Sequence, residues 1–141
     1  MVLDINKMKM GALYKADDNV YISKHYDPTS QTKAVILHIY QFNEEGQIVS
    51  YKFGKPISFG EMDEPKIVIN GWSCSVNSVD DDCLDYQTPQ DIDIPVGCFE
   101  EVLPIQAYKM NVEIIRFLSD KSTYFSGVRQ KAIRKSIPGE V

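Results

Sequence analysis

The chain has 141 residues, of which 43% are hydrophobic and 25% charged, and its net charge is −5 at pH 7. These values are close to globular averages, so they exclude an intrinsically disordered chain and predict a single domain over residues 1–141. The longest apolar runs, AVILHIY and KIVIN, are far shorter than the roughly 20 residues that a membrane-spanning helix needs.

The N-terminus and the cysteines indicate the compartment. The opening stretch MVLDINKMKMGALYK has no uninterrupted apolar segment and does not resemble a signal peptide. Cys74, Cys83 and Cys98 are odd in number and lack the spacing of a disulfide scaffold, which favours reduced thiols. We therefore expect a soluble cytoplasmic protein with no membrane contact.

Residues 8–72 form a strand-rich part. β-branched and aromatic residues recur there in short runs, which are KMGALYK, NVYISKHY, KAVILHIYQF, QIVSYKF, PISF and KIVINGW. The segments between the runs, such as ADDN, DPTSQT and NEEG, carry residues that accept turn geometry. The pattern predicts an antiparallel meander of about five or six strands.

The hairpin KAVILHIYQFNEEGQIVSYKF is the most informative part for function. Its pairing has the same parity whether the loop is Glu45-Gly46 or residues 43–46, so the same side chains share each face. One face is aliphatic and collects Val35, Leu37, Ile39 and Ile48. The other face is aromatic with polar groups, and it collects Ile36, His38, Tyr40, Phe42, Val49, Tyr51 and Phe53.

Neither face is polar, so the sheet needs cover on both sides. Three interpretations of the aromatic face remain open: it packs under a helix as ordinary core, it meets a second copy of the chain, or it stacks a planar ligand. Aromatic rings suit the last two roles because they bury a large area at little rotamer cost. The candidate binding residues on this face are His38, Tyr40, Phe42, Tyr51 and Phe53.

Residues 73–95 are expected to form a long acidic connection. No basic residue occurs between Lys66 and Lys109, and a connection of this length is typical of a functional or covering loop. Within it, the alternation in DIDIP indicates a short strand with its aspartates in solvent. The candidate site for a basic partner surface is the acidic loop, formed by Asp80, Asp81, Asp82 and Asp85.

Metal binding is not expected. A calcium loop that begins at Asp80 would need glycine at its sixth position and glutamate at its twelfth, but Asp85 and Asp91 stand there. A looser carboxylate site formed by Asp80, Asp82 and Asp85 stays open as an alternative. Zinc would need closely spaced cysteine or histidine pairs, whereas the three cysteines are 9 and 15 positions apart.

Residues 98–136 are expected to be helical. Pro104 suits a first helical turn, and Ala107, Met110, Ile114 and Leu118 follow at helical spacing, which predicts a helix from about Leu103 to Ser119. A second helix is predicted from about Ser122 to Ser136. It carries a small basic patch, formed by Lys131, Arg134 and Lys135. A patch of this size on a chain of charge −5 does not favour nucleic-acid binding.

No catalytic signature is present. Cys98 stands before an acidic pair that opposes thiolate formation, and no local motif ties His25 or His38 to a nucleophile. FGKPISFG lacks the spacing of a phosphate-binding loop, so we expect neither catalytic residues nor a cofactor.

The sequence therefore predicts an α+β domain that acts as a non-enzymatic binding or interaction protein. We expect a protein partner with a basic surface and a homo-oligomer. Size and lack of catalytic signatures are typical of small accessory proteins of bacteria and phages. The alternative is a module that stacks a nucleotide-like molecule on the aromatic face.

Overall fold

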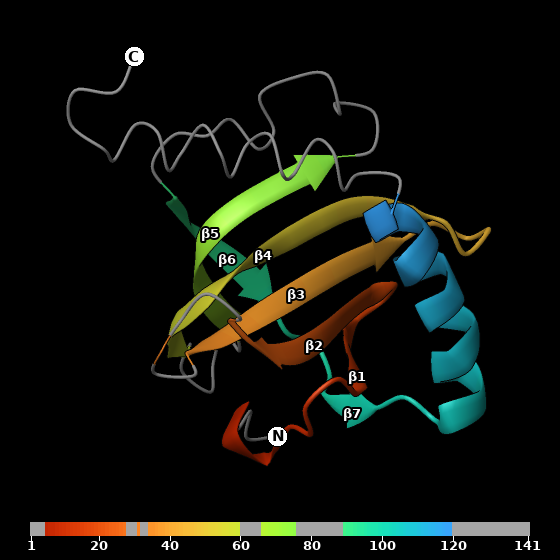
Figure 1. Ribbon diagram of the computed structural model, residues 1–141, viewed down its shortest axis with the longest axis horizontal. Coiled ribbons are helices and arrows are strands. Elements are labelled where there is room, and N and C mark those ends of the chain that lie inside the picture. The colour runs from red at the N-terminus through yellow and green to blue at the C-terminus, as the bar shows by residue number, and fades with distance from the viewer. Residues whose placement is uncertain (1–4, 28–30, 32–33, 60–65, 76–88, 120–141) are drawn as a thin grey trace.

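The computed structural model of the protein describes residues 5–27, 31, 34–59, 66–75 and 89–119 (Figure 1). A short 3-10 helix, η1 (Ile5–Lys7), precedes seven strands, which are β1 (Leu13–Asp17), β2 (Val20–Tyr26), β3 (Val35–Phe42), β4 (Ile48–Phe59), β5 (Lys66–Ser75), β6 (Gln90–Pro95) and β7 (Glu100–Glu101). A helix then occupies residues 104–119. The predicted α+β fold with a meander and a following helix is confirmed, with seven strands in place of five or six.

The sheet is strongly curled. Neighbouring strands are antiparallel in the order β6-β5-β4-β3-β2-β1-β7, so β6 and β7 stand at opposite edges although only residues 96–99 separate them. A flat sheet would hold these edges roughly 29 Å apart, at about 4.8 Å per strand, whereas five backbone steps reach at most about 18 Å. The two edges must therefore approach each other, and in Figure 1 β6 passes behind β4 and β5.

Residues 96–99, which connect β6 to β7, contact β1 and so hold the sheet in its curled form. The amides of Gly97 and Cys98 donate to the carbonyl oxygen of Ala16 at 2.8 and 3.0 Å. The ring of Phe99 stacks on Tyr14 with 5.2 Å between ring centroids. These contacts make β1 the strand on which both ends of the curled sheet meet.

A pair of glycines permits the close approach of β4 and β5. Gly54 and Gly71 stand opposite each other in the register. A Cβ atom on Gly71 would lie 1.9 Å from the carbonyl oxygen of Phe53, and one on Gly54 would lie 2.5 Å from that of Asn70. The two backbones approach too closely for any side chain at either position.

The concave face of the sheet encloses a hydrophobic core, in which most side chains are aliphatic. It contains Ile5, Met8, Tyr14, Ala16, Ile22, Leu37, Ile39, Ile67, Ile69, Ile94 and Val96. Leu37 and Ile39 lie there as the hairpin pattern predicted. Ile48 does not, because a register shift pairs Gln41 with Ser50 but Phe42 with Ile48, which moves Ile48 to the aromatic face.

The helix of residues 104–119 covers part of the convex face. It begins after Leu103, whose carbonyl oxygen accepts from the amide of Ala107 at 2.9 Å. Its inner side and the sheet share a second core, which contains Leu13, Tyr40, Phe42, Ile48, Tyr51, Val102, Ile114 and Phe117. Ala107, Met110 and Leu118 pack against this core, as their helical spacing predicted.

Two expected segments differ in extent. The connection expected over 73–95 is shorter, because β5 runs through Ser75 and β6 occupies Gln90–Pro95 with its aspartates exposed and Ile92 and Ile94 turned to the core. The helical part expected from 98 begins at 104, since Glu100 and Glu101 form β7. The second predicted helix lies outside the described residues. No helix in the described part of the chain is long and apolar enough to cross a membrane.

Candidate functional site

A row of stacked rings crosses β3, β4 and β5 on the convex face. Its members, which we call the aromatic row, are His38, Tyr40, Tyr51, Phe53 and Trp72. Centroids are 5.4 Å apart between Tyr40 and Tyr51, 5.3 Å between Tyr51 and Phe53, and 5.2 Å between Phe53 and Trp72. The rings are neighbours because the register sets Tyr51 opposite Tyr40 and Trp72 opposite Phe53.

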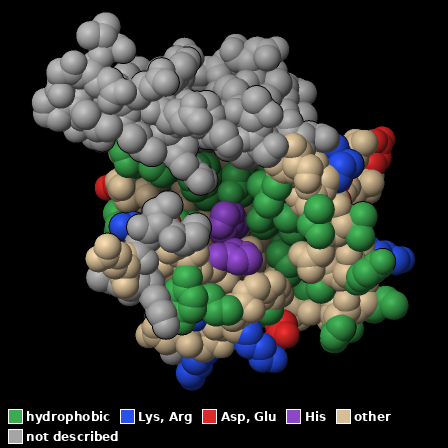
Figure 2. Space-filling model, in the orientation of Figure 1, with side chains coloured by type: hydrophobic (Ala, Val, Ile, Leu, Met, Phe, Trp, Pro, Cys, Tyr) green, Lys and Arg blue, Asp and Glu red, His purple; other side chains and the backbone are tan. Residues whose placement is uncertain are grey.

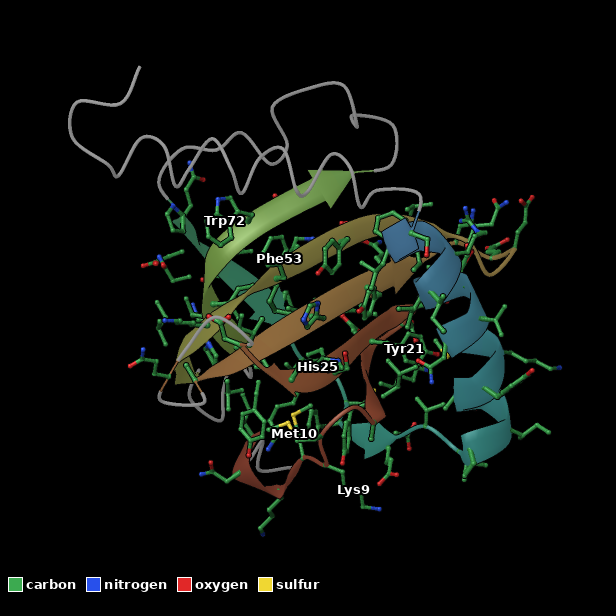
Figure 3. The ribbon with its side chains drawn as sticks, viewed as in Figure 1. Lys9, Met10, Tyr21, His25, Phe53 and Trp72 are labelled. Carbon is green, nitrogen blue, oxygen red and sulfur yellow. The ribbon has the colours of Figure 1, made fainter. Side chains whose placement is uncertain are left out.

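The helix buries one end of the predicted aromatic site. Tyr40, Phe42 and Tyr51 are only 2, 6 and 4% exposed, and Phe117 of the helix packs edge-on against Tyr51 with 5.8 Å between centroids. A ligand could stack on these three rings only if the helix moved away. His38 and Phe53 are half-buried and lie toward the other end of the row, where Figure 3 shows Phe53 next to Trp72.

Two histidines lie side by side on this face, in the hollow seen in Figure 2. The rings of His25 and His38 meet edge-to-face with 4.8 Å between centroids. Nδ1 of His38 is 2.6 Å from the hydroxyl oxygen of Tyr51, and Nε2 of His25 is 3.0 Å from Oγ of Ser23. The imidazoles are thus held by hydrogen bonds to neutral hydroxyl groups.

These surroundings favour the neutral forms. Burial, with a smaller contribution from His25, lowers the pKa of His38 from 6.5 to about 4. Burial also lowers the pKa of His25, and it raises the pKa of Tyr40 to about 12 although a hydrogen bond with Ser23 acts in the opposite direction. Near neutral pH this face presents rings and hydroxyl groups but no charged imidazole.

The described residues hold no group of three or more histidine, cysteine, aspartate and glutamate side chains that could bind a metal ion. Cys98 is half-buried, and its Sγ lies 3.7 Å from the carbonyl oxygen of Lys15. The acidic loop (Asp80, Asp81, Asp82, Asp85) and the basic patch (Lys131, Arg134, Lys135) lie outside the described residues, so both sites stay predictions.

The opposite side of the helix carries a second set of hydrophobic residues. Ile105, Tyr108, Val112 and Ile115, which we call the outer stripe, are 74, 72, 55 and 65% exposed. At about 100° per residue, the stripe is centred roughly 150° around the helix from the side that packs on the sheet. The stripe could have been recognised in the sequence, because its four apolar residues are spaced three, four and three positions apart in the same segment.

An open pocket of about 370 Å³ lies between the helix and two turns of the sheet. Tyr21 and Phe42 line it and meet edge-to-face with 5.5 Å between centroids, while Gln106, Lys109 and Met110 line it from the helix. The pocket is open, and its lining combines an aromatic wall with one cation, Lys109, and one carboxylate, Glu44.

No family model, curated protein or solved structure matches this chain. The geometry of the aromatic row and the outer stripe is therefore the basis on which a function can be inferred.

Proposed function

We propose that this chain is a non-enzymatic interaction protein that binds a protein partner through the outer stripe of its helix. The observation that carries the proposal is the exposure of Ile105, Tyr108, Val112 and Ile115, each more than half exposed, on a helix whose other side is core. Hydrophobic side chains are visible along the outer side of this helix in Figure 2.

The contiguity of the stripe supports this proposal. Single exposed hydrophobic residues are common and need no explanation, but residues three and four apart on a helix are neighbours and form one patch. At roughly 100 Å² for each side chain, the stripe presents on the order of 400 Å², which is within the range of the largest apolar patches on monomers. Charged side chains flank it, among them Lys109 and Arg116, as in an interface with a polar rim.

The acidic loop belongs to the same proposal as a second contact. Four aspartates within six positions, Asp80, Asp81, Asp82 and Asp85, would recognise a basic surface on the partner. Exposed charges are screened over about 8–10 Å at ordinary ionic strength, so association through this loop should slow as salt rises. Binding through the outer stripe depends much less on salt.

We further propose that the protein acts in the cytoplasm as a small accessory protein. The half-buried Cys98 is a free thiol, which suits a reducing compartment.

The proposal is tested by co-purification from the protein's own host. Tagged wild-type chain is compared with Tyr108→Glu in the outer stripe and with Gln106→Glu, an exposed position on the same helix outside the stripe. We expect a partner to be retained by the wild type and by Gln106→Glu and to be lost with Tyr108→Glu. A partner that all three proteins retain equally would refute binding through the stripe.

A second candidate function is stacking of a planar, nucleotide-like molecule at the half-buried end of the aromatic row. The observation that favours it is Trp72, whose Nε1 is buried without a hydrogen-bond partner among the described residues, next to the half-buried ring of Phe53. A ligand with a stacking ring and an acceptor atom would satisfy both groups.

Trp72 is the only tryptophan of the chain, so its fluorescence reports on this site. Titration with nucleotides should quench the emission, and Phe53→Ala should weaken the affinity by roughly tenfold or more, since stacking contributes about 1–3 kcal/mol per base. Unchanged emission up to millimolar nucleotide would exclude this candidate.

A further inference from the structure

We propose that the occupant of the outer stripe is a second copy of this chain, whose helix packs antiparallel to the first. The inference rests on the proposed function, because it names the partner that the stripe binds. Ile105, Tyr108, Val112 and Ile115 repeat at the three-four-three spacing of a coiled-coil seam. Side chains at this spacing insert into holes formed by the same spacing on a facing helix, so the stripe is complementary to itself.

The order of the stripe residues fits a two-fold axis. In an antiparallel pair centred between Tyr108 and Val112, Tyr108 of one copy faces Val112 of the other, and Ile105 faces Ile115. The interface thus contains four pairs of facing residues. Each pair joins two different positions of the sequence, and all four pairs are hydrophobic. The interface is isologous and closes at two copies.

The charged flank beside the stripe faces different side chains in the two possible helix directions. Lys109, Glu113 and Arg116 lie on one flank, where Nε of Arg116 donates to Oε1 of Glu113 at 2.6 Å. In an antiparallel pair this flank of one copy faces the same flank of the other copy. Lys109 of one copy then lies within about 3 Å, along the axis, of both Lys109 and Glu113 of the other. Each Lys109 therefore faces one like charge and the carboxylate of Glu113, which is already paired with Arg116 of its own helix. In a parallel pair the flank would face Asn111 and Leu118, which offer no opposite charge.

The size of the stripe sets the expected affinity. Two stripes of roughly 400 Å² bury roughly 800 Å² in total, and the flanking side chains bring the interface to about 1,000 Å², the lower end for a specific contact. We expect a reversible dimer with a dissociation constant on the order of tens of micromolar.

Sedimentation of purified chain from about 1 µM to 1 mM tests the inference. The wild type and Gln106→Glu should change from monomer to dimer over this range. Tyr108→Glu and Val112→Glu should raise the dissociation constant roughly a hundredfold or more, because each buries an unpaired charge in the seam. Both sites are exposed in the single chain, so circular dichroism should show unchanged folding.

Cysteine cross-linking tests the direction of the helices. Two copies of residue 105 lie about 15 Å apart along an antiparallel pair, beyond the roughly 7 Å that a disulfide spans between Cα atoms. Under mild oxidation the double variant Ile105→Cys with Ile115→Cys should form a covalent dimer, whereas Ile105→Cys alone and the wild type, with its native cysteines, should not. A dimer linked by the single variant would overturn the antiparallel arrangement.

The outcomes separate this inference from the proposed function. A chain that stays monomeric at 1 mM, or a dimer that the stripe variants leave unchanged, overturns the second copy as occupant. If a different protein still co-purifies in a stripe-dependent manner, the proposed function stands without the dimer. If neither a dimer nor a stripe-dependent partner is found, both fail.

Discussion

At the scale of single residues, His38 joins the buried and the accessible parts of the aromatic row. Its Nδ1 is hydrogen-bonded to Tyr51 beneath the helix, while its ring meets the exposed His25. Burial lowers the pKa of His38 from 6.5 to about 4. Between these values the unfolded chain binds a proton that the folded chain does not, so the fold loses stability as the pH falls.

We predict that the free energy of unfolding falls by about 3 kcal/mol through His38 as the pH falls from 6.5 to 4. Above pH 6.5 His38 causes no such loss. Carboxylates also titrate in this range, so His38→Asn is the control, since asparagine retains a hydrogen-bonding atom for Tyr51. Urea unfolding at pH 7 and pH 4 should show a smaller loss in His38→Asn. Equal losses in both proteins would contradict the assignment to His38.

Residue patterns predicted most of the hairpin but not its bulge. The alternation in β3 and β4 places His38, Tyr40 and Tyr51 on one face, because parity survives any hairpin loop of two or four residues. Ile48 is the exception, since the extra residue at the Gln41/Phe42 shift reverses parity for the residues nearest the turn. No side-chain pattern marks such a shift in advance.

At the scale of elements, the helix of residues 104–119 has two apolar sides with different roles. The spacing of Ala107, Met110, Ile114 and Leu118 predicted the inner side. These residues alone are sufficient to predict a helix with one apolar side. The sequence did not reveal the outer stripe, because the residues of the inner side alone account for an amphipathic helix. The residues of the outer stripe become informative only once the structure shows that they are exposed.

The two sides should respond differently to truncation. Phe117 is 2% exposed and packs on Tyr51, so Phe117→Ala should lower the free energy of unfolding by about 3–5 kcal/mol. Tyr108 is 72% exposed, so Tyr108→Ala should change it by less than about 1 kcal/mol at a concentration where the chain is monomeric. Thermal or urea unfolding distinguishes the two, and equal costs would contradict this division of the helix.

The glycine pair in β4 and β5 makes a second test at this scale. Gly71→Ala would place a methyl group 1.9 Å from the carbonyl oxygen of Phe53. We expect the strands to separate there and the free energy of unfolding to fall by roughly 3 kcal/mol or more, as for other severe backbone strain. Ser73→Ala, at an exposed position of the same strand, should stay within about 0.5 kcal/mol. A Gly71→Ala protein as stable as this control would show that the close approach of the two strands does not need glycine.

At the scale of the whole molecule, the curl of the sheet covers one face and the helix covers part of the other. The sequence required cover on both faces because neither is polar, and two helices were the available candidates. The curl itself has no local signal, because it depends on residues 96–99 joining two edges that are far apart in strand order. β7 was missed for a related reason, since two residues form no periodic pattern.

Both cores form without the outer stripe, and our proposal assigns this exposed part of the described chain to a partner. Photo-cross-linking in the host tests this most directly, with benzoyl-phenylalanine placed either at Tyr108 or at Glu45, an exposed residue of the β3–β4 turn. We predict a discrete covalent protein adduct from position 108, of twice the chain mass if the partner is a second copy, and none from position 45. Folded protein that forms no adduct from position 108, or the same adducts from both positions, would contradict the account.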